Sequence, residues 1–266
     1  MAGILVFAET EKGKLKNTSL EAVGAAHTLA GEVGGEVTAL VLGASCPGLE
    51  AELGGAGAAK ILCCCAPALE QYTGDGYARA AAEAIGRVDP QAVLFPATAT
   101  GSDLAPRVAA LLDAGMASDC IELDAGGGGI EAVRPIYAGK ARITVKAEKG
   151  PLIATLRPNA FETVEAGLTA THEEIPLSLA PEELKDRVLE VVKSAGDKVP
   201  LTEAKKIVSG GRGLKGPENF KLIEELAAAL GPGTTVGASR SVVDEGWRPH
   251  ADQVGQTGKT VSPVLY

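Results

Sequence analysis

Short apolar runs alternate with helical patterns over the first hundred residues, and this alternation limits the fold more than any other feature of the chain. Runs that are apolar on both faces are typical of buried parallel strands. Strand–helix–strand units require right-handed crossovers and produce a parallel sheet covered by helices. We therefore expect an α/β fold with a three-layer N-terminal domain. The expected strands are 4–8, 36–42, 59–65 and 91–96, and the expected helices are about 18–32, 49–54, 76–87 and 104–112.

The pattern changes after residue 115, where short strands follow one another without an intervening helix. Glycine-containing turns separate them, which is typical of antiparallel hairpins. We expect these hairpin strands to be added to the parallel sheet at 119–123, 130–137, 142–147 and 152–156. A last strand is expected at 173–179, followed by a charged helix at 181–192.

The length of 266 residues favours two domains. Gly196 and Pro200 lie in a polar stretch that resembles a linker. We place the first domain at 1–193, the linker at 194–203 and the second domain at 204–266.

The formal net charge of −9 argues against a nucleic-acid partner, because no basic block is present to contact phosphates. No apolar run has the length of a membrane span, so membrane insertion is not expected. The chain enters an apolar strand directly, without a basic targeting segment. A soluble, cytoplasmic protein is the expectation.

Five cysteines lie at positions 46, 63, 64, 65 and 120, and the three consecutive ones are interpreted as small hydrophobic residues of a buried strand. Neighbouring strand residues point to opposite faces, so Cys63, Cys64 and Cys65 cannot converge on one ion. No Cys-x-x-Cys pair or nearby histidine completes a site, and no metal site is expected.

Three histidines are the available general bases, and none belongs to a catalytic motif. His27 is expected on the inner face of a helix, His172 on the surface, and His250 in a loop of the second domain. No catalytic residue is therefore assigned.

Two polar groups in the first domain have alternative interpretations. The stretch 98–103 follows a strand and precedes a helix, where a phosphate can bind. Capping by Ser102 or Asp103 is the favoured alternative, because no glycine-rich phosphate loop is present. A basic group, formed by Arg134, Lys140, Arg142 and Arg157, is either a contact face for an acidic partner or a solvated strand face.

Glycine-bounded turns distinguish the second domain. Ser209-Gly-Gly-Arg212-Gly follows one expected strand, and Ala238-Ser239-Arg240 follows the next. A third turn, Gln253-Val-Gly-Gln-Thr257-Gly, comes shortly after. Small residues let a ligand approach the backbone, and inward-pointing amides attract negative charge or ring heteroatoms. A nicotinamide dinucleotide site is poorly supported, because the complete Gly-x-Gly-x-x-Gly spacing and its acidic residue are missing.

These turns resemble motifs of the α subunit of electron transfer flavoprotein. The motifs are Val208-Ser-Gly-Gly-Arg-Gly-Leu-Lys215 with Glu218-Asn-Phe220, Val236-Gly-Ala-Ser-Arg240 with Val243-Asp244, and Gln253-Val-Gly-Gln-Thr-Gly-Lys259. The resemblance implies a partial second Rossmann-like domain that binds FAD, and a heterodimer with the electron transfer flavoprotein β subunit. It implies a redox carrier without a substrate-converting site, which accepts electrons from acyl-CoA dehydrogenases and related enzymes, including those of fatty-acid β-oxidation. A membrane quinone oxidoreductase is the implied acceptor of single electrons.

The resemblance also implies a set of cofactor-binding residues. Arg240 is expected against the flavin ring, Thr257 near flavin N5, and Arg212 near the phosphate or ribityl group. The complete set is Arg212, Ser239, Arg240, Gln253, Val254, Gly255, Gln256 and Thr257.

The family continues beyond the position of Tyr266 with segments that bind the pyrophosphate and adenosine of FAD. If the chain is truncated there, we expect FAD to bind weakly or not at all. Two other hypotheses remain open at this stage. One is a nucleotide-dependent enzyme of the NAD type, and the other is a flavin-free fragment that only docks a partner.

Overall fold

The computed structural model describes residues 3–46, 48–126, 128–177, 179–192 and 199–266. The chain divides into two compact units, Met1–Val191 and Val192–Tyr266, which are described separately. Residues 194–198 of the expected linker lie outside the described residues, so the proposed linker bounds stay a prediction.

A seven-stranded sheet forms the centre of the first unit, and all of its strand pairs are parallel. The strand order is β12-β5-β4-β1-β6-β11-β7. The strands are β1 (Ile4–Phe7), β4 (Val37–Gly43), β5 (Lys60–Cys65), β6 (Ala92–Pro96), β7 (Met116–Cys120), β11 (Leu152–Leu156) and β12 (Thr171–Pro176). The α/β class predicted from the apolar runs is confirmed.

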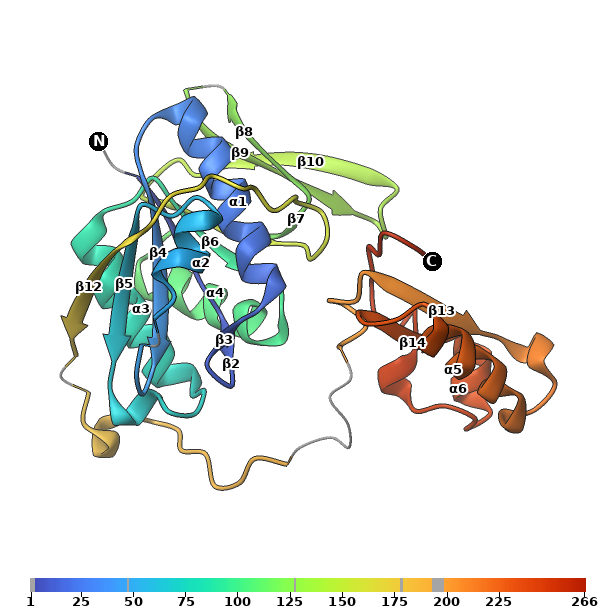
Figure 1. Cartoon of the computed structure of the whole chain (residues 1–266). Coiled ribbons are helices and arrows are strands. Elements are labelled where there is room, and N and C mark those ends of the chain that lie inside the picture. Colours follow the sequence, from blue (N-terminus) through green and yellow to red (C-terminus); the bar gives the residue numbers. More distant parts are fainter. Residues whose placement is uncertain (1–2, 47, 127, 178, 193–198) are drawn as a thin grey trace. The chain divides into compact units, whose positions relative to one another are not determined.

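Helices cover both faces of this sheet and produce three layers (Figure 1). Along β1, Ile4 and Val6 belong to one core cluster, while Leu5 and Phe7 belong to the other. This alternation follows from the strand period of two. The first cluster lies under α1 (Asn17–Val33) and α2 (Glu50–Gly55), and the second lies under α3 (Gly74–Val88) and α4 (Ala99–Leu111).

The expected run of four hairpin strands is only partly correct. Three strands form a separate antiparallel sheet, namely β8 (Glu122–Gly126), β9 (Gly129–Ile136) and β10 (Ala141–Lys146). The segment expected at 152–156 is instead the parallel strand β11, which pairs with β6 and β7. All of its residues are buried, which is typical of a central parallel strand and not of a hairpin with a solvated face. A further small hairpin consists of β2 (Thr10–Glu11) and β3 (Lys14–Leu15).

Helix α4 begins earlier than predicted, and its cap differs from the expected one. Thr98 is the N-cap, and its hydroxyl accepts a hydrogen bond from Gly101 N at 3.0 Å. Asp103 instead accepts hydrogen bonds from Arg107 Nε at 3.0 Å and from Tyr72 at 2.6 Å. Ser102 lies inside the helix. Capping is therefore confirmed, but by a residue other than Ser102 or Asp103.

The charged helix expected at 181–192 is wrong, because only the single turn η2 (Pro181–Glu183) is helical. Leu189 and Val192 are more than four-fifths exposed, so this segment has no buried apolar face to stabilise a helix. Asp186 instead caps α3, since its carboxylate accepts hydrogen bonds from Gly74 N at 2.9 Å and Asp75 N at 3.4 Å.

The second unit contains one parallel strand pair, β13 (Lys206–Gly210) and β14 (Thr234–Ala238). The crossover between them is α5 (Phe220–Ala229), preceded by the turns η3 (Arg212–Leu214) and η4 (Pro217–Asn219). After β14 come the short helix α6 (Arg240–Asp244) and the turn η5 (His250–Asp252). The predicted strand–helix–strand unit is confirmed. In the described ranges of both units, no helix combines the length and apolar character needed to cross a bilayer.

Candidate functional site

Three glycine-bounded turns meet at one edge of the second unit. Ser239 N, just after β14, donates a hydrogen bond to Gly210 O at the end of β13, at 3.0 Å. On the other side of β14, Val254 N donates to Ala238 O at 3.0 Å, and Ala238 forms a bridge with Gln253. The turns after β13, after β14 and after η5 are therefore neighbours. The carboxyl edge of a parallel sheet is the place where α/β folds bind ligands.

The third turn is closed by its own backbone. Lys259 N donates to Gln253 O at 2.7 Å, and Gly258 N donates to Gly255 O at 2.7 Å. Gly255 has a φ of 76°, which favours glycine. At Gly258 a Cβ atom would lie only 2.4 Å from Gln253 O, so no other residue fits without displacing the turn.

Gln253 fixes the position of Thr257. The Gln253 side chain is almost completely buried, with 1% of the residue exposed, and its Nε2 donates to Thr257 Oγ1 at 3.1 Å. Because Thr257 accepts this bond, its own hydroxyl proton is available for a second acceptor. The backbone N–H groups of Gln256 and Thr257 also have no acceptor among the described residues.

The cations flank these donors without being buried. The Arg240 side chain is 52% exposed, and its Nε lies 3.4 Å from the Asp244 carboxylate. Ser239 is half-buried, with its Oγ 3.2 Å from Ser241 Oγ, and its side chain does not cap α6. Arg212 is exposed in η3, on the turn that follows β13.

These residues fit a ligand that is rich in hydrogen-bond acceptors and carries negative charge. Uncapped backbone N–H groups, a threonine hydroxyl and two exposed guanidinium groups are all donors. The structure brings Ser239 and the residues Gln253–Thr257 together around β14, and it places Arg212 on the adjacent turn. Their individual roles in binding stay a prediction.

Two further residues of this region were not singled out by the sequence. Ser209 Oγ is buried without a hydrogen-bond partner among the described residues. It lies so close to Gly237 that a Cβ atom added to this glycine would be only 2.5 Å from it. Arg248 holds the loop before the third turn against α5, since its Nη1 donates to Glu224 at 2.8 Å and its guanidinium carbon lies 5.3 Å from the centre of the Phe220 ring. Ser209 is part of a quoted glycine motif, whereas no pattern pointed to Arg248.

Two of the three histidines lie in the first unit, and the third lies on η5 of the second unit. His27 Nδ1 lies 3.2 Å from Gly57 O, in agreement with the interpretation as a packed helix residue. His250 is exposed in η5. His172 lies in the first unit, on β12.

The cysteine interpretation needs a correction. Cys46 and Cys63 form a disulfide, with Cα atoms 5.9 Å apart, so Cys63 is not a free hydrophobic residue. No histidine stands near the cysteines in the sequence, but the fold brings one to them, since Cys63 Sγ lies 3.9 Å from His172 Nδ1. The interpretation holds for Cys64, which is free and buried, whereas Cys65 is free but only half-buried. Cys120, on β7, is also free and buried, and burial raises the pKa of the Cys64 and Cys120 thiols to about 12.

The basic group of the first unit is partly accounted for by one ion pair. Arg157 donates to both carboxylate oxygens of Asp119, with Nε–Oδ1 at 2.9 Å and Nη2–Oδ2 at 2.6 Å. This pair connects the ends of β7 and β11. Lys140 and Arg142 are exposed, and a contact face for an acidic partner stays a prediction for this region.

Comparison with known families gives two matches that together cover most of the chain. Residues 4–180 match the electron transfer flavoprotein domain. Residues 200–266 match the electron transfer flavoprotein FAD-binding domain. The second match contains all three glycine-bounded turns.

Individual relatives agree with these matches. The chain is 39% identical over 265 residues to the electron transfer flavoprotein subunit alpha of Bacillus subtilis, covering 99% of this chain and 80% of the relative. It is 40% identical over 268 residues to protein FixB of Clostridium saccharobutylicum, covering 99% and 79%. It is 34% identical over 297 residues to the acryloyl-CoA reductase electron transfer subunit beta of Anaerotignum propionicum, covering 99% and 80%.

Proposed function

Because this chain belongs to the electron transfer flavoprotein α-subunit family, a family of electron carriers that bind FAD, we propose a donor and an acceptor for its electrons. It receives electrons from acyl-CoA dehydrogenases and related enzymes. It delivers them singly to a membrane quinone reductase. An α subunit of this kind works together with a β subunit. The relative named as an electron transfer subunit of acryloyl-CoA reductase supports a donor that acts on acyl-CoA thioesters.

The observation that carries the proposal is the meeting of the three turns at the carboxyl edge of β13 and β14. FAD, when bound, supplies the redox chemistry, because it can accept an electron pair and release single electrons. The chain supplies position and charge. We assign binding of FAD to Arg212, Ser239, Arg240 and the residues Gln253, Val254, Gly255, Gln256 and Thr257.

Each part of the third turn has a separate role in this proposal. The buried Gln253 amide holds the Thr257 oxygen, so that the Thr257 hydroxyl proton is directed to an acceptor on the flavin. The N–H groups of Gln256 and Thr257 provide further donors beside it. The glycines keep side chains out of the approach to the backbone.

Arg240 and Arg212 supply positive charge. The Arg240 side chain is half exposed, and its Nε lies 3.4 Å from Asp244 Oδ2. An exposed ion pair of this kind contributes little free energy. The Arg240 guanidinium can therefore turn toward a bound anionic group at little cost. We assign Arg240 to the flavin ring and Arg212 to the phosphate or ribityl region. A cation near the ring favours the reduced, more negatively charged flavin.

The proposal is tested with the chain co-expressed with its β subunit. We expect one FAD per heterodimer, bleaching of the flavin absorption by an acyl-CoA together with its dehydrogenase, and recovery of the absorption when a membrane quinone reductase and quinone are added. NADH without a dehydrogenase should not bleach the flavin. If acyl-CoA and dehydrogenase leave the flavin oxidised while other donors reduce it, the assignment of the donor is wrong.

The binding residues have a matched pair of variants. Thr257→Ser keeps the hydroxyl that accepts from Gln253, whereas Thr257→Val removes it and leaves the buried Gln253 amide without this partner. An unpaired buried amide costs about 1–3 kcal/mol. We therefore expect Thr257→Val to weaken FAD binding and Thr257→Ser to bind almost normally. Equal FAD affinity in both variants would remove Thr257 from the site.

A further inference from the structure

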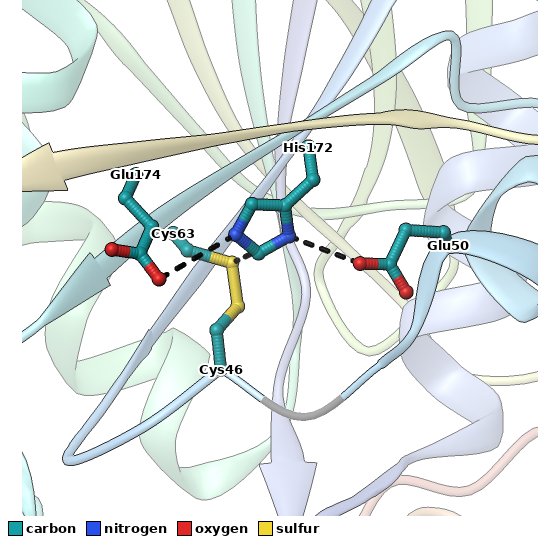
Figure 2. The surroundings of a disulfide bond; sticks show 5 residues. All are labelled: Cys46, Glu50, Cys63, His172 and Glu174. Carbon is teal, nitrogen blue, oxygen red and sulfur yellow. Dashed lines mark hydrogen bonds and ion pairs between the residues drawn. A yellow bond between two sulfur atoms is a disulfide. The ribbon is translucent and has the colours of Figure 1, made fainter.

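Two cysteines and a histidine meet at the edge of the seven-stranded sheet, in the first unit. Cys46 lies in the loop after β4, Cys63 lies on β5, and His172 lies on the edge strand β12 (Figure 2). The Cys46 Sγ, Cys63 Sγ and one His172 ring nitrogen all lie within 4.8 Å of one another. In the structure the two sulfur atoms are joined as a disulfide. The electron-carrying role of the second unit does not use this cluster.

The distances around His172 Nδ1 match those of a tetrahedral metal site. Cys63 Sγ lies 3.9 Å from His172 Nδ1, and Glu50 Oε1 lies 3.1 Å from the same nitrogen. Zn²⁺ bonds of about 2.3 Å to sulfur and about 2.0–2.2 Å to nitrogen and oxygen place neighbouring ligand atoms about 3.4–3.8 Å apart. Shifts of a few tenths of an ångström are therefore enough for these two pairs of ligand atoms. Glu50 starts α2, directly after the loop that carries Cys46.

The other ring nitrogen has a carboxylate nearby, at a distance longer than a hydrogen bond. His172 Nε2 lies 3.8 Å from Glu174 Oε1, on the same strand. Histidine ligands commonly donate their second ring N–H to a carboxylate, which fixes the tautomer and strengthens the ligand. Figure 2 shows the ring between the two carboxylates, with Glu50 on one side and Glu174 on the other. The cluster therefore has three ligand atoms that lie within 4.8 Å of one another, and two nearby carboxylates that contact its histidine. Glu50 becomes the fourth ligand only if its side chain turns further toward the two sulfur atoms.

Burial and charge also suit a cation. Cys63 is buried, whereas the side chains of His172 and Glu50 are 30% and 35% exposed, so an ion can enter from solvent. Two thiolates and one carboxylate carry three negative charges, one more than the two positive charges of a divalent ion. The neutral imidazole adds no charge. Thiolate and imidazole ligands favour zinc over magnesium or calcium.

We propose that reduction of the Cys46–Cys63 disulfide creates a zinc site with Cys46 Sγ, Cys63 Sγ, His172 Nδ1 and Glu50 as ligands. A dithiol reductant breaks the S–S bond, becomes a disulfide itself, and leaves one proton on each cysteine sulfur. Zn²⁺ then replaces these two protons, which pass to solvent. In the reverse direction, exchange with an oxidised dithiol transfers two electrons from the two cysteine sulfurs to that disulfide, which becomes a dithiol; the Cys46–Cys63 bond re-forms and the ion is released. The site connects β4, β5 and β12 in the reduced protein, as the disulfide connects the first two in the oxidised protein.

The test uses the full chain and Zn²⁺ alone as the probe. One sample is reduced with a phosphine and another is kept oxidised; both are equilibrated with Zn²⁺, passed through gel filtration and analysed for zinc by mass spectrometry. We expect about one zinc per reduced chain and none per oxidised chain. X-ray absorption at the zinc edge should show two sulfur neighbours, and it is not disturbed by flavin. No zinc in the reduced sample, or zinc with only oxygen and nitrogen neighbours, would overturn the proposal.

Variants separate the proposed ligands from other zinc-binding groups. Cys46→Ser changes a partly exposed loop residue and should abolish stoichiometric zinc binding without disturbing the sheet. Cys65→Ser is the matched control, because Cys65 lies on the same strand as Cys63 but outside the cluster, and it should bind zinc normally. Glu174→Gln should weaken zinc binding by about tenfold or more, because the carboxylate near His172 Nε2 is lost. Full zinc binding by Cys46→Ser would contradict the assignment.

Discussion

Replacing Gly258 by alanine tests whether the closed third turn is needed for FAD. The added Cβ atom would lie 2.4 Å from Gln253 O, whereas Cβ contacts under 3.0 Å are essentially never seen. The carbonyl must therefore move away by about 0.6 Å. The affected contacts are the hydrogen bond from Lys259 N to Gln253 O, at 2.7 Å, and the bond from Gln253 Nε2 to Thr257, at 3.1 Å.

The expected cost follows from these two contacts. A net hydrogen bond contributes about 1 kcal/mol, and a buried amide left without a partner costs about 1–3 kcal/mol. We expect the closed turn to be destabilised by about 2–4 kcal/mol in Gly258→Ala. If FAD requires the closed turn, 2 kcal/mol raises its Kd by about thirtyfold.

The measurement is a titration of the flavin-depleted heterodimer with FAD, followed by flavin fluorescence, together with urea unfolding of the same samples. Gly86→Ala is the matched control. Gly86 lies on α3 of the first unit, a methyl group added to it would meet no atom within 4 Å beyond its own helix, and it does not have a positive φ. Gly86→Ala should bind FAD as the parent chain does. If Gly258→Ala also binds FAD with unchanged Kd, the closed turn is not part of the site.

Three further predictions concern charge, capping and pH. Arg240→Ala should lower the midpoint potential of bound FAD by about 10–40 mV, since a half-exposed cation contributes about 0.2–1 kcal/mol. Arg240→Lys keeps the positive charge and should retain most of the midpoint potential. A spectroelectrochemical titration that finds no change in Arg240→Ala would exclude Arg240 from tuning the flavin. Thr98→Val should lower the free energy of unfolding by about 0.5–2 kcal/mol, because Gly101 N loses its cap and Glu9 loses the hydrogen bond that the Thr98 hydroxyl donates. Thr98→Ser keeps both bonds and should not lower it, and equal urea midpoints would refute the cap. The buried thiols of Cys64 and Cys120 have pKa values raised from 9.0 to about 12, so their contribution to stability is complete below pH 9.0 and is lost as the pH rises toward about 12. Replacing Cys120 by alanine should make the free energy of unfolding fall less steeply with pH in that range. An unchanged dependence of the unfolding free energy on pH would contradict the burial argument.

Local patterns predicted those parts of the fold that depend on neighbouring residues. The continuous apolar run of β1 is sufficient to indicate a buried parallel strand. The glycine turns could be placed at the ends of β13 and β14, because a strand, a turn and a helix follow one another directly in the sequence. The residues of the candidate FAD site were identified through a family resemblance, and their meeting around β14 is a result of the fold.

Features that depend on distant partners were not predictable in this way. The β11 segment has short glycine-bounded neighbours like those of a hairpin, and only its pairing with β6 makes it parallel. The 181–192 segment has helix-forming residues, but Asp186 is used to cap α3 instead. Cys63 and His172 are 109 residues apart, so no spacing rule connects them.

The pairing of β12 with β5 has a consequence for the order in which the chain folds during synthesis. Thr171 meets Ala59 across 112 residues, so the ribosome must produce most of the first unit before β5 gains its outer neighbour. Contacts of such high contact order form late. Until then β5 is an open sheet edge that carries three consecutive cysteines, and unpaired edges are prone to associate with other chains. A nascent chain halted before residue 171 therefore exposes this edge to other chains, and pairing with β12 removes it.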